Sequence, residues 1–263
     1  MLQPFATFAA RFAECAGWPP RAAMASLVSA QGLRNARGLP LRVVASAGAP
    51  ALTYESRTFE SGALEVREGE WHDLFNVLAW TAYPLTKGAL NARHVKAARE
   101  DLEGGPPADA VAANRGRVRD ALTLFDESGA LFVSSEADLI DDLRAFRWRK
   151  LFWEQRQRVR ASVRVFVFGH AMLEKALAPY VGMTAHVIAL HVDDDFPEAP
   201  PRRQLEIVDE LAAAYMADPA RLRTPQDLAP LPVLGVPGWW PDNECGAFYD
   251  DASHFRAGRT RRR

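Results

Sequence analysis

Polar side chains recur at helical spacing within residues 71–96, a stretch that is otherwise dense in large apolar residues. His72 and Asn76 are four residues apart, so a helix would place them on one face. Pro84 suits the first turn of a second helix. The polar residues expected on one face of that second helix are Lys87, Asn91 and His94. We expect the two faces to meet in a cleft, where imidazoles and amides could exchange protons or hold a divalent metal.

A second candidate group follows residues 163–168, VRVFVF, which have the best strand pattern in the chain. His170 and Glu174 are four residues apart at the start of the next predicted helix. Ligand sites in α/β folds lie at the C-terminal ends of strands, so this pair could bind a metal or transfer protons. A third group, Asp120, Asp126 and Glu127, could hold a divalent cation or simply form a charged turn.

The C-terminal segment carries a third kind of signal, because Pro237-Gly238-Trp239-Trp240-Pro241 puts two indoles on a stiff turn. Such a segment could cover an open edge of the core or close over a pocket as a lid. In the second case Trp240, Asn243 and Arg256 would contact the ligand. We therefore predict four catalytic residues, namely His72, His94, His170 and Glu174. The predicted ligand-binding residues are Asn76, Lys87, Asn91, Trp240, Asn243 and Arg256.

The elements that position these residues follow from apolar periodicity and turn signals. Helices are expected at 3–16, 20–33, 71–82, 84–103, 135–159, 170–177 and 204–216, and strands at 41–46, 53–66, 163–168 and 184–192. An Asp/Ser/Gly turn between two apolar runs predicts a hairpin over 121–133. Together these elements predict one domain, 1–263, with an N-terminal helical region, 1–35. The fold class is α+β or α/β: a mixed sheet of about four to six strands, packed by helices and wrapped by the C-terminal segment.

Composition limits the function classes. With 48% hydrophobic and 25% charged residues the chain can form a core, and a net charge of -1 argues against nucleic acid or an anionic membrane as partner. Two cysteines, Cys15 and Cys245, do not make a disulfide framework and fit a reducing compartment. The N-terminus lacks the pattern of a signal peptide, and no apolar run approaches the roughly 20 residues of a membrane span. We expect a cytoplasmic protein with no membrane partner.

Several strings occur in a fixed order along the chain: WHDLFNVLAW, YPLTKGALNARH, RDALTLFDESGA, FGHAMLEKALAPY and PGWWPDN, then FYDD and FR. From about Trp71 to Arg259 the chain resembles a bacterial family catalogued as domain of unknown function 3025. The resemblance implies a cytoplasmic bacterial protein. It implies no particular reaction, ligand or cofactor.

Two main function classes follow. The first is a hydrolase, metal-dependent or acid–base, that acts on a small or phosphorylated substrate through the polar cleft. The second is a non-catalytic interaction or scaffold protein, whose polar faces are buried hydrogen-bond networks that fix helix packing. A minor alternative is an HNH-like metal nuclease, because His72, Asn91 and His94 occur in a similar order. Such sites use two strands and a helix, whereas His72 is predicted on a helix.

Overall fold

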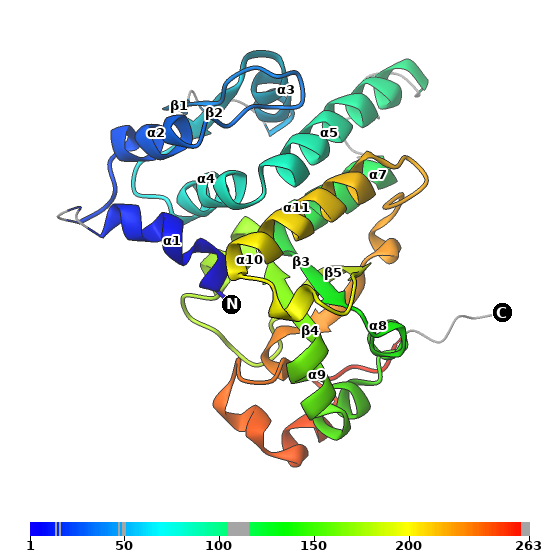
Figure 1. Cartoon of the computed structure of the whole chain (residues 1–263). Helices are drawn as coiled ribbons and strands as arrows, with labels where there is room; N and C mark the ends of the chain where they lie inside the picture. Colours follow the sequence, from blue (N-terminus) through cyan, green and yellow to red (C-terminus); the bar gives the residue numbers. More distant parts are fainter. Residues whose placement is uncertain (14, 16, 47, 49–50, 105–115, 259–263) are drawn as a thin grey trace.

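The computed structural model describes residues 1–13, 15, 17–46, 48, 51–104 and 116–258. One connected cluster of buried apolar side chains extends from Phe5 to Phe255, so both end regions of the described chain contribute to it. Figure 1 shows a helical part with a small two-stranded sheet and, next to it, a larger sheet with its own helices. The candidate residues come from both parts.

The N-terminal part is mainly helical. Its elements are η1 (Gln3–Phe5), α1 (Ala6–Ala9), η2 (Ala10–Phe12), α2 (Arg21–Ala30), β1 (Arg42–Ala45), α3 (Ala51–Ser61) and β2 (Ala63–Val66). β1 and β2 pair in parallel, with α3 as the connection between them. The predicted strands over 53–66 are therefore wrong for most of that range. Gly62, at a φ of 73°, ends α3 and passes against Pro40, whose carbonyl oxygen would lie 2.3 Å from a β-carbon at Gly62.

The central helices are α4 (Trp71–Ala82), α5 (Pro84–Gly104) and α7 (Arg117–Ser128). The first two confirm the predicted pair of helices and its break at Pro84. The third replaces the predicted hairpin, because residues 121–128 continue as helix and only Gly129 begins a strand. Ala121, Leu122 and Phe125 are buried at the spacing of one helix face. The Asp-Glu-Ser residues that looked like a turn form the last turn of α7.

The larger sheet contains β3 (Gly129–Ser134), β4 (Val163–Val167), β5 (Thr184–His191) and β6 (Ala229–Pro232), in the order β4-β3-β5-β6. β3 and β5 are parallel, whereas β4 and β6 pair antiparallel with their neighbours. β4 and β5 follow each other in the sequence with α10 between them, but they are not neighbours in the sheet, since β3 lies between them. A mixed four-stranded sheet packed by helices confirms the predicted α+β class. β6 contains two prolines, Pro230 and Pro232, which lack an N–H to donate, and such residues are tolerated in a strand at the edge of a sheet.

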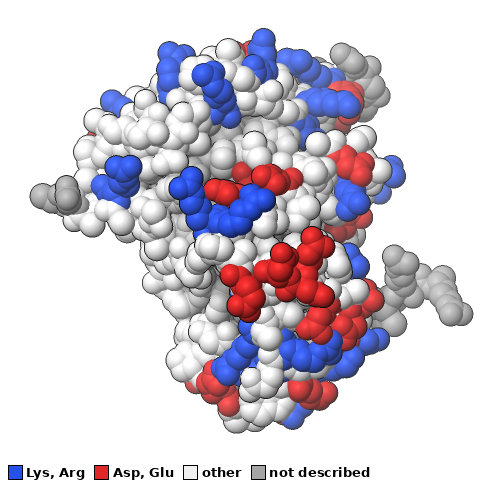
Figure 2. Space-filling model, in the orientation of Figure 1, with Lys and Arg blue, Asp and Glu red and all other residues white. Residues whose placement is uncertain are grey.

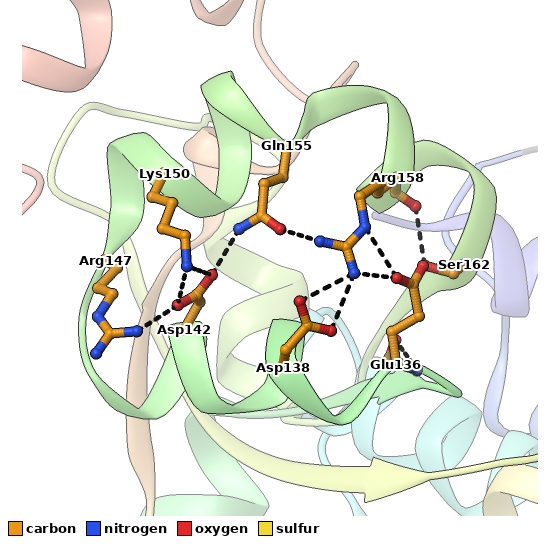
Figure 3. A network of polar contacts seen from close by, with 9 residues as sticks. Glu136, Asp138, Asp142, Arg147, Lys150, Gln155, Arg158 and Ser162 are labelled. Carbon is orange, nitrogen blue, oxygen red and sulfur yellow. Dashed lines mark hydrogen bonds and ion pairs between the residues drawn. The ribbon is translucent and has the colours of Figure 1, made fainter.

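The long helix predicted over 135–159 is broken into α8 (Ala137–Arg144), the π-helical turn η3 (Lys150–Glu154) and α9 (Arg156–Ser162). Figure 3 shows the polar network between them, which surrounds the Asp142 side chain, only 1% exposed. That carboxylate accepts hydrogen bonds at 2.8 Å from Arg147, 3.0 Å from Lys150 and 2.5 Å from Gln155. Burial alone would raise the pKa of Asp142, but these donors lower it below its usual value. An unpaired buried carboxylate is costly, so the chain bends to supply its donors.

Arg158 forms the other half of the same network and contacts Glu136 and Asp138. Figure 2 shows the basic side chains near α9 flanked by acidic ones, so charges of both signs share this face. The exposed arginines of this region are therefore largely balanced by neighbouring acids.

The remaining elements are helices and helical turns of the C-terminal half. They are α10 (His170–Lys175), η4 (Phe196–Glu198), α11 (Pro201–Ala217), η5 (Pro225–Asp227), η6 (Val233–Gly235), η7 (Pro241–Glu244) and η8 (Gly246–Asp250). α11 runs beside α5 and contacts β3 and β5 (Figure 1). The C-terminal segment covers the body as predicted, with Trp239 and Trp240 half-buried against the core. Within the described part of the chain, no helix combines the length and the apolar character of a membrane crossing.

Candidate active site

His72 and His170 meet at the N-terminal ends of α4 and α10. Their Nε2 atoms are 2.9 Å apart, and their rings cross at 82° with centroids 4.2 Å apart. The side chain of His72 is 38% exposed, whereas that of His170 is only 7% exposed. Glu174, one turn along α10, places Oε2 3.7 Å from Nδ1 of His72. Three of the four predicted catalytic residues therefore form one group that is open to solvent on the His72 side.

Asp126, in the last turn of α7, lies behind His170. Its Oδ2 is 3.7 Å from Nδ1 of His170, a nitrogen that is buried and has no hydrogen-bond partner among the described residues. Burial lowers the pKa of His170 to about 4, and the nearby Asp126 carboxylate opposes that shift without cancelling it. His170 is therefore a neutral imidazole at neutral pH.

The tautomers of the two histidines follow from this charge state. A neutral His170 carries one N–H, and we assign it to Nδ1 because that nitrogen faces the Asp126 carboxylate. Its Nε2 must then accept a hydrogen bond, so the donor across the 2.9 Å contact is Nε2 of His72. A neutral His72 consequently keeps its lone pair on Nδ1, which faces Glu174. The basic nitrogen of the group is thus on the exposed side.

A buried chain of polar contacts continues from Asp126 into the helical part. Lys87 Nζ donates to Asp126 Oδ1 at 2.6 Å and to Asn76 Oδ1 at 2.9 Å, and Asn76 donates to the Tyr54 hydroxyl at 2.7 Å. Burial alone would raise the pKa of Asp126, but Lys87, followed by His170, lowers it below its usual value. Burial, reinforced by Glu55 and Asp126, raises the pKa of Tyr54 above its usual range. The predicted faces of α4 and α5 therefore meet through the contact between Asn76 and Lys87.

Asn91 and His94 lie on the predicted face of α5, beyond Lys87. Asn91 Nδ2 donates to the Glu55 backbone oxygen at 3.0 Å and to the Glu55 carboxylate. Burial lowers the pKa of His94, and the charges of Glu55 and Asp126 oppose that shift. Among the described residues, no hydrogen bond links Asn91 or His94 to His72 or His170. These two residues do not join the exposed group.

Gly169 allows the close approach of backbones that brings His170 to Asp126. Phe168 and Gly169 both donate to the Gly129 carbonyl oxygen, at 3.0 and 2.9 Å. A β-carbon at Gly169 would lie 2.4 Å from the Glu127 carbonyl oxygen and 2.5 Å from the Gly129 nitrogen. Both obstacles are backbone atoms, which cannot swing away as a side chain does. The turn from β4 into α10 therefore requires glycine.

Replacing Gly169 by alanine is expected to lower the free energy of unfolding by about 1–3 kcal/mol, as overpacking does in cores. Chemical denaturation measures the change. The matched control is Gly88→Ala in the interior of α5, where the added β-carbon would lie 3.6 Å from Ala36 N and no closer to any other atom. That variant should be neutral or more stable by up to about 1 kcal/mol. Equal effects of the two substitutions would contradict the close-approach explanation.

The C-terminal candidates contact a different part of the molecule. Asn243 is buried, donates to the Leu234 and Val236 carbonyl oxygens, and accepts from Arg156 Nη2 at 3.1 Å. The Trp240 indole donates to Asp242 at 3.2 Å. Arg256 is exposed, and its carbonyl oxygen accepts from Trp148 at 2.9 Å. The structure does not bring these three residues to the histidines, and their observed contacts hold the C-terminal segment in place.

Two members of the site were missing from the prediction. Asp126 appeared only as part of an acidic turn, and Tyr54 only as a strand residue. The one signal for Asp126 is its spacing of four residues from Leu122, which fits the same stretch as a helix that packs on its neighbours. Within the described residues, no three His, Cys, Asp or Glu side chains are grouped so that they could hold a metal ion.

Comparison with known proteins bears on the identity of the chain. No curated protein and no solved structure matches it. One family model does match, under the description "Protein of unknown function (DUF3025)", and it covers residues 41–259, most of the chain. This confirms the predicted resemblance and extends it toward the N-terminus from Trp71, so that β1, α3 and β2 are included. The chain therefore belongs to the DUF3025 family.

Proposed function

We propose that the chain is a hydrolase that uses acid–base catalysis at His72 and acts on a small or phosphorylated substrate. The observation that carries the proposal is the ordered series of partners behind a half-exposed imidazole: His72, then a neutral His170, then the Asp126 carboxylate. In such a series the inner groups hold the outer imidazole in one tautomer and orientation.

The chemical steps follow from the assigned tautomers. Nδ1 of His72 accepts a proton from a water molecule as the water oxygen attacks the substrate carbonyl carbon or phosphorus. The imidazolium so formed lies 3.7 Å from Glu174 Oε2, which stabilises its charge. The hydrogen bond from His72 Nε2 to His170 is kept in both protonation states, so no ring has to turn. Nδ1 then returns the proton to the leaving group, which departs as an alcohol or a similar neutral species.

A non-catalytic scaffold is the second candidate, and the buried half of the network favours it. The Lys87 side chain is only 3% exposed, and Asn91 is 1% exposed. Buried polar networks of this kind fix how helices pack. Under this reading His72 and His170 would be the exposed end of a structural network, with no enhanced reactivity. The two candidates therefore differ in what His72 does.

The test uses His72→Gln, which keeps a side-chain N–H donor for His170 but has no basic nitrogen. His191→Gln, at the exposed end of β5, is the matched control. We expect His72→Gln to lower the hydrolysis of p-nitrophenyl acetate or p-nitrophenyl phosphate by about 100-fold, as loss of a general base does. Its melting temperature should stay close to that of the parent protein, because His72 is half-exposed.

A second readout needs no substrate. Diethyl pyrocarbonate acylates neutral imidazoles, and peptide mass spectrometry gives the rate for each histidine. We expect His72 to react several-fold faster than the more exposed His191, because its inner partners hold it in the tautomer whose Nδ1 carries no proton. A His72 that reacts no faster than His191, together with unchanged hydrolysis in His72→Gln, would favour the scaffold.

A further inference from the structure

A cavity of about 480 Å³ lies at the opposite end of the four-stranded sheet from His72 and His170. Asp126 precedes β3, and His170 follows β4, which is antiparallel to β3, so the candidate active site is at the N-terminal end of β3. The cavity is lined by Ala189, Leu190 and His191, the last residues of β5, which is parallel to β3. The two places are therefore separate.

The sheet itself leaves room for the cavity. β6 pairs with Thr184–Val187, so the last four residues of β5 extend beyond it and have no strand neighbour on that side among the described residues. Residues of α8 and α11 also line the cavity. The C-terminal ends of parallel strands are a common position for small-molecule sites, because the connecting elements diverge there and leave a crevice.

The lining combines an apolar surface with two arginines, Arg144 and Arg221, and with the two aspartates that pair with them, Asp141 and Asp218. Ile140, Leu190 and Leu211 supply the apolar part. The guanidinium carbon of Arg221 lies 4.9 Å from the ring centre of Tyr215. Burial raises the pKa of Tyr215, while Arg221 and Arg144 both oppose that shift, so both charges act at the same phenol. The cavity thus has an aromatic ring with the Arg221 guanidinium beside it.

The existing partners of these arginines are easily exchanged. Arg144 pairs with Asp141 at 3.6 Å, and Arg221 pairs with Asp218 at 3.0 Å. The side chains of Arg144 and Arg221 are 60% and 56% exposed. Exposed ion pairs contribute little stability, so a carboxylate that offers two oxygens to a guanidinium can compete with them.

We propose that this cavity binds a small organic carboxylate with a flat apolar body. The carboxylate lies between Arg144 and Arg221, and the body lies on Tyr215 and the apolar wall. This site is independent of the hydrolase proposed above, because no residue is shared with it.

Isothermal titration of the full chain with 3-phenylpropionate tests the proposal. We expect a Kd on the order of 1 mM, a value typical of so small a ligand. The neutral 3-phenylpropanamide and inorganic phosphate should each bind at least about tenfold more weakly, because each lacks half of the recognised chemistry. No heat with 3-phenylpropionate up to about tenfold above that Kd would overturn the proposal, as would equal binding of the amide or of phosphate.

Variants locate the site. Arg144→Gln and Arg221→Gln should each weaken binding of 3-phenylpropionate about tenfold, the usual effect of losing one charged hydrogen bond. Arg202→Gln, at the other end of α11 with a side chain 92% exposed, is the matched control and should bind like the parent protein. All three positions are exposed, so their melting temperatures should not change. Equal loss in Arg202→Gln, or none in Arg144→Gln and Arg221→Gln, would overturn the assignment.

Discussion

Replacing Lys87 by methionine is expected to lower the free energy of unfolding by about 3–5 kcal/mol, because it leaves the buried Asp126 carboxylate without its cation. The Lys87 and Asp126 side chains are only 3% and 11% exposed, and their charged atoms are 2.6 Å apart. Water cannot take the place of the missing ammonium at such a position. Urea or guanidinium denaturation at neutral pH measures the loss.

Two further variants separate the buried pair from other effects of the substitution. Lys96→Met is the control on the same helix. Lys96 is 68% exposed and forms a surface ion pair with Glu100 at 3.8 Å. It should change stability by less than about 1 kcal/mol. The double variant Lys87→Met with Asp126→Leu removes both charges and should regain most of the stability, since apolar replacements of buried pairs are often neutral. A double variant no more stable than Lys87→Met would show that the charge of Asp126 is not the cause.

The polar faces of α4 and α5 were predictable because they depend on spacing within one helix. His72 with Asn76, and Lys87 with Asn91 and His94, share faces as the 3.6-residue period requires. The partners across helices were not predictable in the same way. The contacts of Lys87 with Asp126 and of His72 with His170 join residues 39 and 98 positions apart, so only the packing of the helices decides them.

Two of the errors in secondary structure have a common cause. At 121–133 and at 53–66, short apolar runs next to turn-forming residues were interpreted as strands, although short runs fit a helix equally well. Residues 117–128 become a helix because Ala121, Leu122 and Phe125 then share a buried face. The long helix predicted over 135–159 failed for a different reason. Its periodicity is good, but the buried Asp142 needs donors from Arg147, Lys150 and Gln155, and a straight helix does not turn all three toward it.

Asn243 shows why a pattern typical of binding residues was not enough to identify them. Tryptophan, asparagine and arginine on a proline-rich loop are typical of a lid. The same residue types also serve to fix an irregular segment, because its backbone groups need partners that a helix or sheet would supply internally. Asn243 is fully buried and satisfies two carbonyl oxygens, of Leu234 and Val236, so in this chain it holds the loop.

Acidification from about pH 6.5 to pH 4 is expected to remove about 3 kcal/mol of stability that belongs to His170 alone. Burial lowers its pKa from 6.5 to about 4 in the folded chain. Between these two values the unfolded chain binds a proton that the folded chain does not, so stability falls as the pH falls. The stabilisation is fully present above pH 6.5 and is lost by about pH 4, at about 1.4 kcal/mol for each pH unit.

The measurement is the free energy of unfolding at several pH values for the parent protein and for His170→Gln, which cannot take up the proton. His170→Gln should be less stable than the parent protein at pH 7, because its amide fits the His72 and Asp126 contacts poorly, but its stability should decline less on acidification. Other buried histidines, such as His94, titrate in both proteins and cancel in the difference. His191→Gln, at the exposed end of β5, should follow the parent curve. Parallel curves for the parent protein and His170→Gln would mean that His170 is protonated in the folded chain near pH 6.5. Its Nε2 could then no longer accept the hydrogen bond from His72, and the proposed series of partners behind His72 would lose its basis.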